Sequence, residues 1–281
     1  MFKSHPNLPK GKEIFMNKNK EHIILKTENL SIGYQQKKQQ KVIGKNINIE
    51  IEKGKFIALV GENGIGKSTL LRTLSNVQNP LKGKILFNDK LLSEYSALEL
   101  SKTFSLVLTE RLPESQLTVF EIIAIGRQPY TNWIDQLSEK DIEKINWAIE
   151  LTEINHLQHE KFYQLSDGQL QRVLIARALA QDTAIIILDE PTAHLDIHNK
   201  FNVFSLLKKL VKTTNKTIII STHEINLAIQ LVDEFILFTK DNLVHDSTSR
   251  LIENNQFSSI FNSKIINFDV KTNQFIITKN D

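Results

Sequence analysis

The sequence predicts an α/β protein built on a mostly parallel β-sheet, and two observations support this fold class. Short apolar runs rich in Ile and Val recur along the chain, bounded by Gly or polar residues, at 56–60, 105–108, 184–188, 217–220 and 235–238. Their hydrophobicity is continuous rather than alternating, which is typical of strands buried on both faces of a parallel sheet. Helical patterns separate these runs, and an alternation of strands and helices indicates an α/β domain.

The chain begins with residues 1–22, which are rich in Lys and Asn and contain no apolar stretch of signal-peptide length. We expect this segment to be a flexible extension. A second methionine, Met16, opens a sequence that leads directly into the first expected strand, so translation could begin at Met1 or at Met16.

The helical patterns repeat apolar residues at i, i+3, i+4 and i+7, which predicts amphipathic helices. The middle pattern lies in residues 138–157, where Ser138 and Asp141 offer a capping box. This middle segment predicts a helical insertion from about 93 to 163. The apolar positions are Leu70, Leu71, Leu74 and Val77, then Ile142, Ile145, Ile149 and 151–154, then Leu170, Val173, Leu174 and Ala178.

Composition limits the classes of protein to consider. With 281 residues, of which 41% are hydrophobic and 24% charged, the chain is globular rather than disordered or fibrous. The net charge is only +3, which gives no reason to expect a nucleic-acid partner. The sequence has no Cys, which excludes disulfides, thiolate catalysis and Cys-ligated metal sites and suits a reducing cytoplasm. No apolar run approaches the roughly 18 residues of a membrane-spanning helix.

Residues 61–69, GENGIGKST, match the phosphate-binding pattern G-x-x-x-x-G-K-[ST] between an expected strand and an expected helix. Gly61, Gly64 and Gly66 would let backbone N–H groups converge on a phosphate, toward which the following helix aims its positive end. Lys67 would reach the β- and γ-phosphates, and Ser68 would bind Mg²⁺. The motif predicts a nucleoside triphosphate site, whose other loop positions are Glu62, Asn63 and Thr69.

A second motif, AIIILDEP at 184–191, places two carboxylates at the end of an expected buried strand, where parallel sheets bind ligands. Asp189 would hold Mg²⁺, directly or through water. Glu190 would point elsewhere and polarise the attacking water as a general base. A DE pair after a strand is a weak signal alone, but together with the phosphate loop it predicts one nucleotide-hydrolysis site.

The order of GENGIGKST, LSDGQ, ILDEPTAHLD and STHE resembles the nucleotide-binding subunits of ABC transporters, whose signature reads L-S-G-G-Q. The resemblance implies an ABC-type P-loop NTPase fold, with an N-terminal antiparallel β subdomain and an inserted helical subdomain, and hydrolysis of ATP with Mg²⁺. In that family the signature contacts the γ-phosphate of ATP held by the opposite subunit, so Ser166, Gly168 and Gln169 would do so in a homodimer. Asp167 replaces the usual Gly; its carboxylate suits a helix N-terminus and is expected to point away from the phosphate.

Three further residues each match a single functional position of the family. Tyr34, in ENLSIGYQQ, matches the aromatic residue that stacks on adenine, a contact that needs only a π-face. His223, in STHE, matches the switch histidine at the γ-phosphate and is expected to take part in catalysis with Glu190. Asp196, in AHLD, matches the loop that crosses the dimer interface.

The residue after the strand FSLVL departs from the family pattern, and a pair of histidines has the spacing of metal ligands. The family normally has a Gln after the strand FSLVL that touches Mg²⁺ and the attacking water; here Thr109 fits the aligned position best and keeps an oxygen for Mg²⁺, with Glu110 as the alternative. His194 and His198 are spaced i, i+4 and could suggest a metal site, but other ligands are missing and both lie in the expected interface loop.

The resemblance assigns residues 23–260 to the ABC ATP-binding domain, with the helical subdomain at about 93–163, and residues 261–281 to a C-terminal tail. Residues 117–133 and 221–238 are similar to the ATPases that energise import of iron(III)-siderophores, haem and vitamin B12. Matches to the G-R-x-P motif of that group are Gly126, Arg127 and Pro129.

Such an ATPase works as a homodimer on polytopic membrane permease subunits at the cytoplasmic face of the cell membrane, and a substrate-binding protein takes part indirectly. The sequence of such an ATPase does not identify the transported substrate. One alternative is a soluble ABC-type ATPase in iron–sulfur cluster assembly or translation, although translation factors usually carry two cassettes and this chain has one phosphate loop. A nucleic-acid ATPase would need a long coiled coil, for which the 122 residues from Lys67 to Asp189 leave no space.

Overall fold

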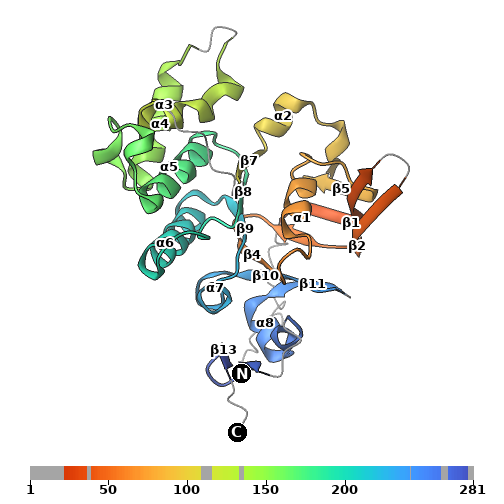
Figure 1. Cartoon of the computed structure of the whole chain (residues 1–281). Coiled ribbons are helices and arrows are strands. Elements are labelled where there is room, and N and C mark those ends of the chain that lie inside the picture. Colours follow the sequence, from red (N-terminus) through yellow and green to blue (C-terminus); the bar gives the residue numbers. More distant parts are fainter. Residues whose placement is uncertain are drawn as a thin grey trace, which may run out of the picture.

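The computed structural model describes residues 22–36, 39–108, 116–132, 136–240, 242–260 and 265–277. They form two β-sheets, a C-terminal hairpin and the helices that cover them (Figure 1). The expected extension up to residue 21, as well as Thr109 and Glu110, lies outside the described residues.

The larger sheet has six strands in the order β11-β10-β4-β9-β8-β7. All neighbours are parallel except β11, which runs antiparallel to β10 at one edge. The strands are Phe56–Val60 (β4), Phe104–Val107 (β7), Ile185–Asp189 (β8), Thr217–Ser221 (β9), Glu234–Phe238 (β10) and Leu243–Ser247 (β11). The five strands predicted from apolar runs are thus confirmed, with ends that move by no more than one residue.

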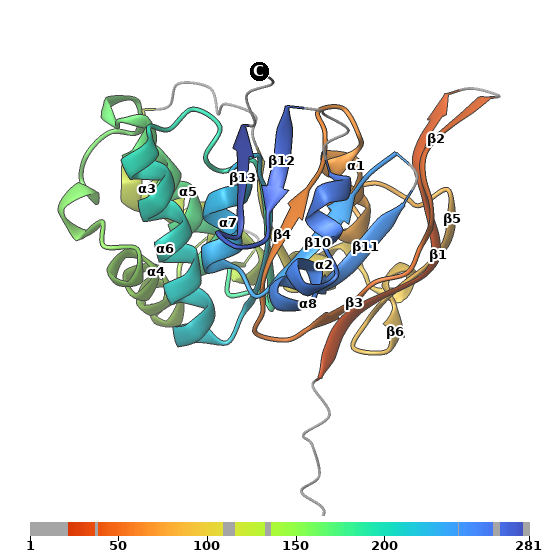
Figure 2. The same cartoon turned by 90° about the horizontal axis from the view of Figure 1, so that it is seen from below.

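The smaller sheet is antiparallel and comes from the N-terminal part of the chain, as expected. Its strands follow the order β2-β1-β5-β6, and β3 pairs with β1 beside that path. In Figure 2 the ribbon of β1 and β2 runs along one side of the molecule. The strands are Ile23–Gln36 (β1), Gln39–Ile47 (β2), Glu50–Glu52 (β3), Lys82–Phe87 (β5) and Lys90–Leu91 (β6).

Helices cover both faces of the larger sheet, and alternate residues of β4 show how the two layers divide. Phe56, Ala58 and Val60 pack in one core with α5, α6 and α7. Ile57 and Leu59 face the opposite core, which contains α1 and the antiparallel sheet. The sheet is therefore buried on both faces, which is why its strands read as continuous apolar runs.

The helices vary from one to five turns, and none of those described is both long and apolar enough to cross a membrane. The α-helices are Lys67–Leu74 (α1), Ala97–Ser101 (α2), Val119–Ala124 (α3), Glu139–Leu151 (α4), Asp167–Ala180 (α5), Ile197–Thr214 (α6), Ile225–Leu231 (α7) and Thr248–Glu253 (α8). Short 3₁₀ segments lie at Leu92–Glu94 (η1), Ile125–Tyr130 (η2), Asn155–Leu157 (η3), Phe162–Gln164 (η4) and Gln256–Ser259 (η5).

Two predicted apolar positions do not face the core. α1 ends at Leu74, so Val77 lies beyond the helix and is 59% exposed. In α4, Ile145 and Ile149 are buried as predicted, but Ile142 is 42% exposed. Ile142 lies in the first turn of α4, one turn closer to the helix N-terminus than Ile145.

The start of α4 is confirmed and its predicted end is wrong. Ser138 is the N-cap and forms a capping box with Asp141. The helix stops at residue 151 rather than near 157, because Glu153 adopts the left-handed conformation with φ of 61°, which a continuing α-helix does not allow.

The segment predicted as a helical insertion at 93–163 also contains the strand predicted at 105–108. Its residues Phe104–Val107 form β7, which pairs with β8 and belongs to the six-stranded sheet. Among its later elements, α3 and α4 pack against α5, and η2 contacts both α3 and α5. In Figure 1 these helices lie together on the opposite side of the strands from α1.

The residues of the G-R-x-P match hold this helical layer together. A Cβ on Gly126 would lie 2.4 Å from the carbonyl oxygen of Arg177, so only Gly allows η2 to approach α5 this closely. The buried Arg127 donates to Oδ1 of Asp141 at 2.9 Å and to the carbonyl oxygen of Ala180 at 2.7 Å. Burial alone would raise the pKa of Asp141, but hydrogen bonds from Ser138 and Arg127 hold it below its usual value.

The C-terminal segment packs onto the domain. Its hairpin, β12 (Ile266–Asp269) and β13 (Gln274–Ile277), places Phe268 and Phe275 against Phe257, with ring centroids 5.1 and 6.4 Å away. The side chain of Asn226 on α7 donates to and accepts from the backbone of Phe275. The described part of the expected tail is therefore fastened to the helix that follows His223.

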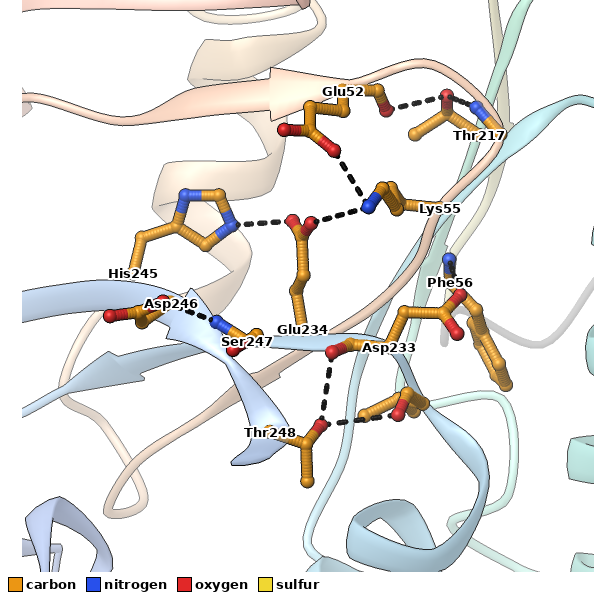
Figure 3. A network of polar contacts seen from close by, with 12 residues as sticks. Glu52, Lys55, Phe56, Thr217, Asp233, Glu234, His245, Asp246, Ser247 and Thr248 are labelled. Carbon is orange, nitrogen blue, oxygen red and sulfur yellow. Dashed lines mark hydrogen bonds and ion pairs between the residues drawn. The ribbon is translucent and has the colours of Figure 1, made fainter. Parts of the chain in front are cut away.

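A network of charged side chains joins the two sheets near the first residue of β4 (Figure 3). The carboxylate of Glu234 lies 3.0 Å from Nε2 of His245 and 3.5 Å from Nζ of Lys55. Lys55 also lies 2.7 Å from the carboxylate of Glu52 on β3. Glu234 and His245 are largely buried, so the Glu234 carboxylate depends on these partners rather than on water.

Glu234→Ala is expected to lower the free energy of unfolding by about 1–3 kcal/mol, because it removes the acceptor shared by Lys55 and His245 in a largely buried place. Chemical denaturation measures the loss. Glu50→Ala is the matched control, since Glu50 pairs with Lys26 on the surface, where an ion pair contributes roughly 0–1 kcal/mol. Equal losses in the two variants would contradict a stabilising role for the buried network.

Candidate active site

The predicted phosphate loop connects β4 to α1, as the motif requires. Gly64 and Gly66 have φ of 74° and 116°, which are left-handed values that other residues adopt with strain. Gly66 is the N-cap of α1, and no described side chain caps this helix, whereas Ser, Thr or Asp caps α2 to α6 and α8. The uncapped N–H groups suit an anion, because the helix dipole adds positive potential there.

Lys67 lies inside this loop and is only 5% exposed. Its Nζ donates to the carbonyl oxygens of Gly61 at 3.2 Å and Glu62 at 3.4 Å and lies 3.7 Å from Oε1 of Glu190. Burial lowers the pKa of Lys67, although the charges of Glu190 and Asp189 act in the opposite direction. An anionic ligand at the loop would add negative charge next to this buried ammonium.

The carboxylates of the second motif stand at the end of β8. Asp189 is its last residue and is buried, and Glu190 follows with φ of 49° in the left-handed region. Oε1 of Glu190 lies 2.9 Å from Nε2 of His223. A carboxylate only accepts hydrogen bonds, so a proton on Nε2 would let His223 donate to Glu190. Nε2 is also 3.2 Å from Nζ of Lys67, so Lys67, Glu190 and His223 form one cluster.

Sequence reasoning missed Ser221, which is completely buried beside this cluster. Its hydroxyl donates to Oδ1 of Asp189 at 2.5 Å and accepts the N–H of Glu190 at 2.8 Å. The available signal was that Ser221 ends the apolar run TIIIS with a polar residue and begins the STHE motif.

Tyr34 lies on β1 beside the start of α1. The residue is 42% exposed, and its hydroxyl is 2.8 Å from Oγ1 of Thr69. Tyr34 therefore lies next to the last residue of the phosphate loop and is partly exposed to solvent. Ser68 occupies the first turn of α1, and Asn63 is exposed at the tip of the loop.

The signature segment forms the start of α5. Ser166 is the N-cap, and its capping box with Gln169 satisfies backbone donors of the first turn. Gly168 faces Asn199, and a Cβ there would lie 2.9 Å from the Asn199 side chain. Asp167 lines a pocket that Glu190 and His194 also border. α5 and α1 lie on opposite faces of the sheet in both Figure 1 and Figure 2.

Asp196 caps α6, because its carboxylate accepts the N–H of Asn199 at 2.8 Å. Ile197 and Phe201 follow on the surface, 86% and 52% exposed. His194 and His198 are near in sequence, but the described part of the chain contains no group of three or more His, Cys, Asp or Glu residues that could hold a metal ion.

The chain is similar to proteins of a known family. Residues 44–193 match the ABC transporter family. The iron(3+)-hydroxamate import ATP-binding protein FhuC of Bacillus subtilis is 35% identical over 225 residues, which is 80% of this chain and 82% of that protein. A solved ABC transporter assigned to the metal-chelate type, in an inward-facing conformation, gives a TM-score of 0.73 at 30% identity and covers 85% of this chain and 89% of that chain.

The dimeric structure of the ABC transporter cassette MJ0796 gives a TM-score of 0.68 at 26% identity, over 80% of this chain and 99% of that chain. The match of the family model covers more than half of the chain, and it includes the phosphate loop, the signature segment and the carboxylates of β8. The chain therefore belongs to the ABC transporter family, as an ATP-binding subunit with an ATPase fold and ATPase activity.

Proposed function

We propose that this chain is the ATPase that energises uptake of an iron(III) chelate of the siderophore type through a separate permease. The cluster of Lys67, Glu190 and His223 beside the phosphate loop is the observation that carries the hydrolytic part. The relative that imports iron(3+)-hydroxamate supports the cargo class. The haem and vitamin B12 importers of the same resemblance have no such support here.

In the proposed site, ATP stacks its adenine on Tyr34 and places its phosphates against the N–H groups of residues 61–69. Lys67 binds the β- and γ-phosphates. Ser68 and Asp189 would hold Mg²⁺, since hydroxyl and carboxylate oxygens are ligands that Mg²⁺ prefers, and the ion would neutralise phosphate charge. Glu190 accepts a proton from the attacking water, and His223 holds the Glu190 carboxylate through Nε2.

Two copies complete the proposed site. Ser166, Gly168 and Gln169 of one copy contact the γ-phosphate of ATP held by the other, and Asp196 lies in the loop between the copies. The positions of α1 and α5 on opposite faces of the sheet support this arrangement, because the phosphate loop and the signature segment of one chain pack in different layers. The proposed ATP-binding domain spans 23–260, with the tail at 261–281.

We further propose that the permease docks on residues 118–130, at the cytoplasmic face of the cell membrane. This segment carries Ile125 and Tyr130, which are 38% and 36% exposed, and Leu117 beside it is 38% exposed. Apolar side chains on a short helical layer suit the helix-in-groove contact that a membrane partner would offer.

Ile125→Asp is expected to weaken permease association roughly 10-fold or more, as for an interface hot spot, while ATP binding stays unchanged. Co-purification in detergent measures association. Ile276→Asp is the matched control, because Ile276 is 41% exposed on β13 of the C-terminal hairpin. Unchanged association of the Ile125 variant would place the docking surface elsewhere.

The function itself is tested by expressing the chain with the polytopic membrane proteins encoded beside its gene and asking which co-purifies. A stable partner supports the importer, and uptake of iron(III) chelates into liposomes then tests the cargo. The absence of any membrane partner, with ATPase activity intact, would favour the soluble alternative in iron–sulfur cluster assembly.

A further inference from the structure

Ser221 contacts both carboxylate residues of the active site from the neighbouring strand. The pairing of β8 with β9 ends at Asp189 and Ser221, so the N–H of Glu190 lies beyond the backbone ladder. The Ser221 hydroxyl takes the place of a strand carbonyl by accepting this N–H at 2.8 Å, and its own proton goes to Oδ1 of Asp189 at 2.5 Å. One buried hydroxyl thus uses its donor and one acceptor position on adjacent residues.

Glu190 needs such support because its backbone is strained. A φ of 49° is left-handed, which costs a residue with a Cβ roughly 1–2 kcal/mol, and such conformations persist only where surrounding contacts hold them. This turn directs the side chain toward Nε2 of His223, at 2.9 Å. A relaxed backbone at Glu190 would move Oε1 from that contact.

The second contact acts on the rotation of Asp189. A hydrogen bond to Oδ1 fixes the plane of the carboxylate and so the direction of its other oxygen. Partners of this kind orient metal-binding carboxylates, and their loss typically lowers metal affinity or activity by about 10- to 100-fold.

We propose that Ser221 is a positioning residue that sets both carboxylates at once: it orients Asp189 toward Mg²⁺ and holds the backbone turn that aims Glu190 at the water. This inference rests on the proposed roles of Asp189 and Glu190. It predicts that the hydroxyl itself, rather than the volume of the side chain, is needed for turnover.

Ser221→Thr and Ser221→Val test this directly, because the two variants have nearly the same shape and differ in the hydroxyl. We expect the Val variant to lose about 10- to 100-fold in kcat with little change in KM for ATP, and the Thr variant to retain most of kcat. Mn²⁺ titration followed by electron paramagnetic resonance gives a second readout. It uses ATP complexes in a Glu190→Gln background, where the Val change should weaken Mn²⁺ binding by a similar factor and the Thr change should not.

Wild-type kcat and wild-type Mn²⁺ affinity in both the Thr and the Val variant would overturn the proposal, even if both melt at lower temperature than the wild type. If the added methyl group disturbs both branched variants, Ser221→Ala decides alone: wild-type kcat and Mn²⁺ affinity there would also overturn it. Glu190→Gln without the second change separates the proposed role of Ser221 from the role of Glu190 on which it rests. Undiminished hydrolysis in that variant refutes the role of Glu190, whereas a large loss there with no effect of Ser221→Val refutes only the role of Ser221.

Discussion

Glu190→Gln is expected to lower ATP hydrolysis by about 10²- to 10⁴-fold, which is the usual contribution of a positioned general base. Gln keeps the shape of the side chain but cannot take a proton from the attacking water. Its amide can still meet Nε2 of His223, where the carboxylate oxygen now lies at 2.9 Å, so the surroundings should stay in place. ATP binding should persist because the phosphate loop is unchanged.

The state of the bound ATP gives this prediction a second measurement. If ATP stays uncleaved between residues 61–69 of one copy and 166–169 of the other, the variant should accumulate as an ATP-bound dimer. Phosphate release and size-exclusion chromatography with ATP and Mg²⁺ measure the two effects. Glu143→Gln is the control, since Glu143 is exposed on α4. Hydrolysis at nearly the wild-type rate would mean that another group activates the water.

Lys67→Ala should act differently, by weakening ATP binding as well as turnover. Nζ lies in the loop among the carbonyl oxygens of Gly61 and Glu62, and its burial leaves a cation that phosphate oxygens would compensate. Loss of a charge-assisted hydrogen bond of roughly 1.5–3 kcal/mol corresponds to an affinity about 10- to 100-fold lower. Calorimetric titration with ATP measures the change.

Lys82→Ala is the matched control for Lys67, because Lys82 is an exposed residue of β5. It removes one positive charge from the protein without entering the loop. Unchanged ATP affinity in the Lys67 variant would show that backbone N–H groups alone hold the phosphates. A comparable loss in both variants would instead indicate a general effect of net charge.

The strands of the larger sheet were predictable because burial on both faces leaves a local mark, a continuous apolar run. The phosphate loop was predictable for a related reason, since its glycines and Lys67 act within nine consecutive residues. Helix ends were predicted less well. Val77 continues the apolar spacing of α1 although the helix ends at Leu74, and Glu153 ends α4 by a backbone conformation that spacing does not encode.

The sequence by itself determined the α/β class, the five parallel strands and the family, because each depends on neighbouring residues or on motif order. Only the tertiary structure decided which side chains meet. Lys67 and His223 are 156 positions apart and come within 3.2 Å because β4 and β9 are neighbours in the sheet. The pairing of β8 with β9 likewise brings Ser221 next to Asp189, and the left-handed turn at Glu190 completes the cluster. Strand order and backbone conformation arise from packing across the whole chain, so no local pattern contains them.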